Sequence, residues 1–373
     1  MRALVWPVVL VILAAVIYRG SIHREMVDFK VYRTAADRAL KGETLYRTSD
    51  AHYQFKYLPA FAVAMVPFAK LDLEAAKAIW FALSAGLLTM LVRWSLRGLP
   101  ERRRRDAVLI GFVILFMAKF YAHELTLGQT NILLATLIVA GLLAVQVDEP
   151  HLGAGLFALA AFVKPYALIL LPWLAVSAGF GPALTGLGVL GIGLAAPSLL
   201  FGWQGNAMQL AAWYQTVRDT TAPNLLGADN ISIAAMWAKW IGLGPVANAL
   251  TLLVIGALLA LTAWVWQKRS TVDSPEYLEI AMLMVLVPLI SPQGWDYVLL
   301  LATPATIVIV DRWYELTPAW RYTAIAAQIL MGLTIFDVMG RALYARFMAL
   351  SIVSVAAIVI VVVLAQLRRA KLA

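Results

Sequence analysis

The chain has 373 residues, of which 62% are hydrophobic and 14% are charged. That is far more apolar surface than a water-soluble core of this size needs, so the composition predicts an all-α integral membrane protein. The formal net charge of +9 comes from basic residues gathered beside apolar segments, a pattern typical of lipid headgroup contacts and not of nucleic-acid binding. The absence of cysteine excludes disulfides and thiol chemistry.

The apolar segments predict about twelve membrane crossings, because roughly 20 helical residues cross a bilayer core of about 30 Å. One arginine precedes the first segment and no small-residue cleavage pattern follows it, so we expect a retained anchor. No soluble domain is evident, and we expect one membrane domain over residues 1–373. The predicted crossings are residues 3–18, 75–95, 106–121, 131–147, 151–163, 166–178, 183–201, 246–266, 277–290, 297–311, 319–337 and 347–367.

The first polar region, residues 19–74, begins with a predicted amphipathic helix at residues 26–40 that Gly42 ends. Asp28 lies in its first turn, with Tyr32 on the same side. A carboxylate there can act as a general base that takes a proton from a hydroxyl. It can equally be an exposed acid of the kind favoured near a helix N-terminus, and the pattern leaves both open.

Two lysines stand close before prolines at predicted membrane boundaries. Lys56 and Tyr57 precede Pro59, and Lys164 precedes Pro165 between two short apolar segments. Such lysines can hold a phosphate as point charges, although lysines near the end of a crossing more commonly extend to lipid headgroups. We predict a shallow helical hairpin with Lys164 at its tip. Residues 57–71, which contain two prolines, predict an interfacial or re-entrant segment.

The turn at residues 128–131 opens the next crossing and follows His123 and Glu124. Gln129 and Asn131 can bind sugar hydroxyls or a phosphate, but Asn131 or its neighbour can also simply cap the following helix. No second histidine follows four residues after His123, so a metalloprotease site is excluded. With four histidines in the chain, we expect neither a metal nor another cofactor.

A second polar turn, residues 291–297, interrupts two apolar segments. Asp296 can position an acceptor or balance a basic group, or it can be a solvated loop acid. Trp295 can bind substrate or anchor the chain at the membrane interface. Arg341 and Arg346, further along the chain, are more typical of lipid headgroup contacts.

Dense basic clusters at residues 97–105, 268–269 and 368–371 predict the cytoplasmic side. Counting crossings from these clusters places both termini inside and the polar turns on the opposite side, with residues 19–74 as the first extracytoplasmic loop. The basic residues within residues 19–56 run against this assignment. Polar groups that gather at one face are typical of a membrane active site, whereas a transporter or flippase would hold its site near the midplane.

Taken together, these motifs resemble glycosyltransferase family 87. The resemblance rests on Asp28-Phe29 with Tyr32, the Gly42 to Tyr46 turn, Lys56-Tyr57-Leu58-Pro59, Gly128-Gln129-Thr130-Asn131, Lys164-Pro165 and Ser291-Pro292 with Trp295. It implies a polytopic bundle of the GT-C type, in a family that includes polyprenyl-phosphate-mannose-dependent mannosyltransferases and an arabinofuranosyltransferase. It also implies that Asp28 is catalytic and that donor and acceptor meet on the outer face. In that family a histidine commonly follows the tryptophan, where this chain has Asp296.

We therefore expect inverting transfer of a mannose-like hexose, or of a pentose, from a polyprenyl-phosphate donor to a glycolipid or glycan hydroxyl in the cell membrane. The alternative is a transporter or flippase of lipids or small solutes. In the enzyme, Asp28 would be the base, and Lys164 and Lys56 would hold the donor phosphate. The expected substrate-binding residues are Tyr32, Tyr57, His123, Glu124, Gln129, Asn131, Trp295 and Asp296.

Overall fold

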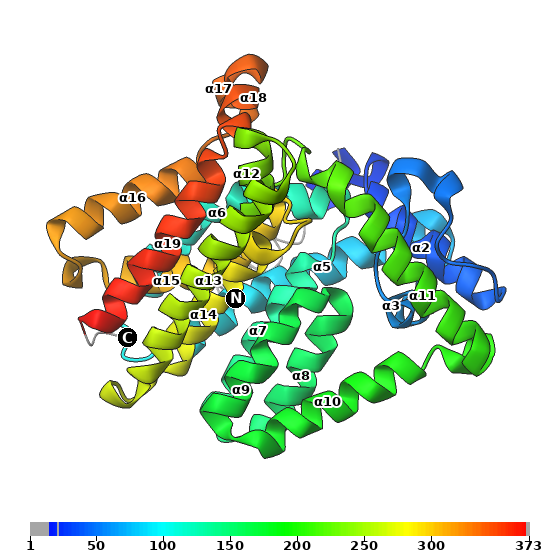
Figure 1. The fold of residues 1–373 in the computed structure, drawn as a ribbon, viewed down its shortest axis with the longest axis horizontal. Helices are drawn as coiled ribbons and strands as arrows, with labels where there is room; N and C mark the ends of the chain where they lie inside the picture. Colours follow the sequence, from blue (N-terminus) through cyan, green and yellow to red (C-terminus); the bar gives the residue numbers. More distant parts are fainter. Residues whose placement is uncertain (1–14, 21, 371–373) are drawn as a thin grey trace, which may run out of the picture.

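The computed structural model describes residues 15–20 and 22–370, so most of the predicted crossing at residues 3–18 lies outside it. The described chain is helical almost throughout, and the one β-bridge within it joins Asn230 to Trp295. The longer helices run diagonally through the molecule, with α2 and α11 at one side (Figure 1). The α-helices are α2 (Val27–Leu40), α3 (Pro59–Ala64), α4 (Val66–Ala69), α5 (Leu73–Gly98), α6 (Asp106–Leu127), α7 (Asn131–Gln146), α8 (Pro150–Val163), α9 (Leu170–Ala178), α10 (Phe180–Ala195), α11 (Ser198–Leu225), α12 (Ile233–Ile241), α13 (Pro245–Gln267), α14 (Glu276–Ile290), α15 (Thr303–Asp311), α16 (Pro318–Gly332), α17 (Phe336–Met339), α18 (Arg341–Ala349) and α19 (Ile352–Arg369).

Four of the described helices, α5, α6, α13 and α19, are long and apolar enough to cross a membrane. Helices α10 and α11 would add a fifth crossing if this pair, bent by 92°, is one broken span. The count of about twelve crossings is therefore not confirmed. Apolar segments such as α7, α8 and α14 do form helices where the sequence predicts them, but they have 16, 14 and 15 residues. These lengths fall short of the roughly 20 residues that a full crossing takes.

The centre of the bundle is α14, in which every residue from Tyr277 to Leu289 is buried. It packs against α7, α13, α15 and α19, and the following segment Asp296–Ala302 is buried as well. A helix with apolar residues on all sides needs partners on all sides. The uniform hydrophobicity that predicts a membrane crossing at residues 277–290 thus marks a helix enclosed by protein.

The break at Lys164-Pro165 is present, as the sequence predicts. Helix α8 ends at Val163, Lys164 is extended, and a short 3-10 helix (Pro165–Ile169) leads into α9. Proline disfavours helical geometry at the preceding residue, which explains the position of the break. The rings of Phe157 in α8 and Trp173 in α9 meet edge to face at 5.9 Å, so the two helices fold back on each other as a hairpin.

Helix α11 fills most of the interval between the predicted crossings at residues 183–201 and 246–266, where the sequence predicts no helix. It has 28 residues with a kink at Gly202, whose φ of +68° favours glycine. The helix packs on α2 and α3 (Figure 1). Trp213 donates from Nε1 to the carbonyl of Lys56 at 3.1 Å, and the Gln209 side chain accepts from the Leu45 amide at 3.1 Å. The sequence does not predict this helix, because polar residues within it interrupt the apolar pattern.

Helix α6 separates two polar ends of the bundle. It begins at Asp106, next to the basic loop, where the backbone amides of Arg103 and Arg104 donate to Asp311. It has 22 residues and ends at Leu127, so it is about 33 Å long at a rise of about 1.5 Å per residue. The turn that follows reaches α2. The basic loop and the α2 region therefore lie at opposite ends of one long helix.

Candidate active site

A cavity of about 470 Å³ lies where α2, α11, the turn before α7, the Lys164 turn and the loop before residue 297 meet. Its volume is within the range of about 300 to 1,000 Å³ that small-ligand sites usually have. It brings together eight of the predicted site residues, which come from distant parts of the sequence: Asp28, Tyr32, Lys56, Tyr57, His123, Gln129, Lys164 and Trp295.

Gly128 makes the approach between α2 and the turn before α7 possible. It adopts a φ of +69° as it ends α6, a conformation that favours glycine. A Cβ atom at this position would lie only 2.8 Å from the Cβ of Phe29 in α2. The close contact brings the first turn of α2, with Asp28, beside Gln129. The glycine before Gln129 thus has a steric reason in the packing of α2.

The Gln129 side chain uses all of its hydrogen-bonding capacity. Its Nε2 donates to Asp28 Oδ2 at 2.8 Å and to the Tyr297 hydroxyl at 3.2 Å. Its Oε1 accepts from the hydroxyls of Tyr32 at 2.9 Å and Tyr57 at 3.2 Å. The four partners fix which end of the amide faces Asp28. One oxygen of the Asp28 carboxylate is consequently held in place.

Asp28 lies in a mostly desolvated setting on the cavity wall. Burial raises the pKa of its carboxyl above the usual value, while the hydrogen bond from Gln129 and the nearby Lys164 and histidines lower it. Burial is the largest of these effects. A carboxylate whose pKa is raised toward the working pH is a more effective proton acceptor in a transition state.

Two lysines face the same cavity. The Lys164 ammonium lies 5.9 Å from the ring centre of Tyr57. Burial lowers the pKa of Lys56, an effect that the charge of Asp28 opposes. Among the described residues, neither ammonium is within ion-pair distance of a carboxylate. Both are therefore placed to meet an anionic ligand.

Glu124 and Asn131 are not on the cavity wall, in contrast to the expected binding role. Both are buried and contact each other, with Asn131 Nδ2 donating to Glu124 Oε2 at 2.8 Å. Glu124 Oε1 also accepts from the backbone amides of Asn131 and Ile132. These amides begin α7, so Glu124 caps that helix, and neither Asn131 nor Thr130 does so through its side chain.

Asp296 is also buried behind the cavity wall. Its carboxylate lies 3.7 Å from His123 Nδ1 and 4.0 Å from the Lys119 ammonium. Its backbone amide donates to the carbonyl of Asp229 at 2.9 Å. Of the two functional alternatives that the sequence leaves for Asp296, this position matches the balancing of basic groups. Trp295, its neighbour, does line the cavity.

Sequence reasoning missed several residues on the cavity wall. Trp213 and Val217 come from α11, and Asp229 follows that helix. Asp229 is in place because Ile231 donates to the carbonyl of Gly294 at 2.7 Å, which joins the two loops. The one local signal was the polar pair Asp229-Asn230 between apolar segments. The other missed polar or aromatic wall residues are His52, Tyr53, Gln54, Tyr166, Gln293 and Tyr297.

Within the described residues, no three His, Cys, Asp or Glu side chains come together in a way that could hold a metal ion. Comparison of the chain with curated proteins gives no match, and comparison with solved structures gives none either. The model of glycosyltransferase family 87 matches residues 55–292, which is more than half of the chain and includes Lys56, Gln129 and Lys164. The chain thus belongs to glycosyltransferase family 87 and is a membrane glycosyltransferase.

Proposed function

We propose that this glycosyltransferase moves a mannose-like hexose from a polyprenyl-phosphate donor to a hydroxyl of a glycolipid or glycan. The observation that carries the proposal is one cavity that holds the Asp28 carboxylate together with Lys56 and Lys164. A carboxylate suits the proton of an attacking hydroxyl. The two ammonium groups suit the phosphate of the donor.

The reaction would proceed as a single displacement with inversion. The acceptor oxygen attacks the anomeric carbon and its proton passes to Asp28, while the bond from the anomeric carbon to the phosphate oxygen breaks. The electron pair of that bond leaves with the polyprenyl phosphate, whose charge Lys164 and Lys56 neutralise. Positioning of the two substrates and stabilisation of the leaving phosphate supply most of the acceleration. The base adds a factor of about 10² to 10⁴.

The position of the cavity supports a reaction at the extracytoplasmic face of the cell membrane. The cavity adjoins the end of α6, and the basic loop at residues 97–105 adjoins its start. Short loops rich in lysine and arginine favour the cytoplasm. A lipid-linked monophosphate donor is also suited to that face, because its lipid keeps it in the membrane. A pentose donor would use the same chemistry, so a donor panel distinguishes the two sugars.

The test is sugar transfer by the purified protein in lipid, with a panel of polyprenyl-phosphate hexoses and pentoses. Asp28→Asn keeps the shape of the side chain and removes the base, so we expect kcat to fall by at least about a hundredfold. Asp37→Asn is the matched control, because Asp37 lies on the same helix but pairs with Lys41 at the surface. Equal rates in Asp28→Asn and wild type would show that Asp28 is not the base. No product from any donor would overturn the proposed function.

A further inference from the structure

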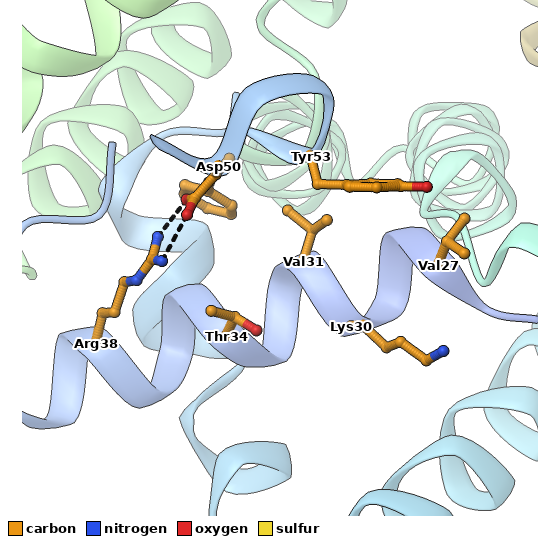
Figure 2. Close-up of a pocket in the computed structure, with 8 residues that line it drawn as sticks. Val27, Lys30, Val31, Thr34, Arg38, Asp50 and Tyr53 are labelled. Carbon is orange, nitrogen blue, oxygen red and sulfur yellow. Dashed lines mark hydrogen bonds and ion pairs between the residues drawn. The ribbon is translucent and has the colours of Figure 1, made fainter. Parts of the chain in front are cut away.

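A second cavity, of about 420 Å³, lies along another side of α2 (Figure 2). The helix contributes Val27, Val31 and Thr34, and the segment opposite contributes Asp50, Tyr53 and Phe55. Figure 2 shows the Tyr53 ring extended above Val31 toward Val27. Tyr53 is 54% exposed, so its ring has no role in the core. An apolar floor with a few polar groups at its edge is the usual character of a small-ligand site.

The second cavity adjoins the active-site cavity, and three residues line both. Val27, Val31 and Tyr53 line both, and Asp28 lies between the two valines in sequence. Lys56 and Lys164 line the active-site cavity alone. A molecule that reaches from Asp28 into the second cavity therefore extends away from the lysines that would hold the donor phosphate.

The wall opposite α2 is held in a defined conformation. Arg38 donates two hydrogen bonds to Asp50, at 2.5 and 2.8 Å, and a third to the carbonyl of Leu45 at 3.3 Å. Next to Asp50, Ala51 has a φ of +49° and a ψ of −116°, a conformation that alanine rarely adopts. Such strain persists only where the surroundings impose it, and it is common in binding segments. The cavity is thus preformed by the Arg38 pair.

We propose that the second cavity is an acceptor subsite, which binds the sugar residue adjoining the one that carries the reacting hydroxyl. This inference rests on the proposed function. The apolar face of a sugar ring fits against Val31 and the Tyr53 ring, while Thr34 and Asp50 meet its hydroxyls. Of the two basic residues that line the cavity, Arg38 is already paired with Asp50, and Lys30 can donate hydrogen bonds to the hydroxyls of the sugar. The preferred acceptor is accordingly a glycan of at least two sugar residues.

The experiment compares two acceptors that carry the same reacting sugar, as an alkyl monosaccharide and as the corresponding alkyl disaccharide, with the donor that gives product in the panel. We expect wild-type kcat/KM to be at least about tenfold higher for the disaccharide, as one well-packed contact would give. Thr34→Trp fills the second cavity and should abolish this preference, mainly through a higher KM for the disaccharide. Tyr53→Ala should reduce the preference as well.

Two variants outside both cavities serve as matched controls, one at Thr317, which directly precedes α16, and one at Tyr322 on that helix. Thr317→Trp and Tyr322→Ala change exposed side chains, and each should keep the wild-type preference. A wild type that uses both acceptors equally well would overturn the subsite while the proposed function stands. A Thr34→Trp protein that keeps the preference would do the same. No product from either acceptor in the wild type would refute the function itself, and the subsite with it.

Discussion

At the scale of single residues, Gln129 determines the orientation of Asp28. The amide donates to one carboxylate oxygen while its own oxygen accepts from Tyr32 and Tyr57. Exchanging the two ends of the amide would place an acceptor against the carboxylate and lose the hydrogen bond to Asp28, whereas the tyrosine hydroxyls can either donate or accept. Gln129 is therefore a positioning residue that acts through Asp28, the proposed base.

Replacing Gln129 with leucine should reduce kcat/KM by about ten- to a hundredfold, because hydrogen bonds to charged groups contribute about 1.5 to 3 kcal/mol. The pH profile should change in a defined direction. The hydrogen bond from Gln129 lowers the pKa of Asp28, so its loss raises that pKa further. The base works only when deprotonated, and the acidic limb of kcat/KM should move to higher pH.

The measurement is kcat/KM as a function of pH for both proteins. Gln146→Leu provides the matched control, because Gln146 donates to the carbonyl of Gly98 at 2.9 Å and does not line the cavity. An acidic limb that stays in place in Gln129→Leu, despite a lower rate, would show that Gln129 does not act through Asp28.

At the scale of elements, the turn before α7 depends on a cap from the preceding helix. Glu124, in the last turn of α6, accepts hydrogen bonds from the backbone amides that begin α7 and from the Asn131 side chain. The first amides of a helix lack partners within the helix, and they need one most when they are buried. The same carboxylate thus fixes the angle between α6 and α7 and the position of Gln129 between them.

Replacing Glu124 with alanine should destabilise the protein by about 1 to 2 kcal/mol or more, the usual cost of losing a cap, and lower its melting temperature in detergent. Glu124→Gln should lose less stability than Glu124→Ala, because the amide oxygen can still accept hydrogen bonds from the backbone amides of Asn131 and Ile132. Thermal unfolding of the two variants beside wild type checks this order. If the glutamine variant were the less stable of the two, the carboxylate would have a role other than capping.

Local signals predict part of this architecture well. Gly42 ends α2, and Lys164-Pro165 breaks the α8–α9 hairpin, because each feature depends on the chemistry of adjacent residues. Eight expected site residues also meet at one cavity. The sequence left open whether Asn131 or its neighbour caps α7, and the cap is Glu124, seven residues before the amide of Asn131. Helix α11 was missed because only its tertiary contacts with α2 and α3 explain it.

At the scale of the whole molecule, short apolar helices account for the difference between the twelve predicted crossings and the four or five long apolar spans among the described residues. A run of apolar residues such as α14 carries the same signal whether lipid or protein surrounds it. The structure resolves this ambiguity through burial, which the sequence does not contain. The two ends of the bundle are nevertheless distinct, with the cavity that holds Asp28 at one and charged contacts at the other.

Glu279 is the centre of those charged contacts. It is fully buried, and it joins α9, α14 and α19. Trp173 Nε1 donates to its Oε2 at 2.8 Å, Arg368 Nη1 lies 3.4 Å from its Oε1, and Arg269 lies 3.7 Å from its Oε2. Removing one partner of a buried ion pair is costly because the charge compensation inside the protein is lost.

Glu279→Gln should therefore destabilise the protein by about 3 to 5 kcal/mol and lower its melting temperature strongly. Glu276→Gln is the control, since Glu276 is partly exposed and pairs with Arg269 at 3.1 Å. Its replacement should cost about 1 kcal/mol or less. At low temperature, where Glu279→Gln stays folded, its kcat/KM should match wild type, because the cavity lies near the opposite end of α14. That helix is about 22 Å long, from 15 residues at about 1.5 Å each. A loss of activity without a loss of stability would show that the two ends of the bundle are coupled, and the assignment of Glu279 to stability alone would be wrong.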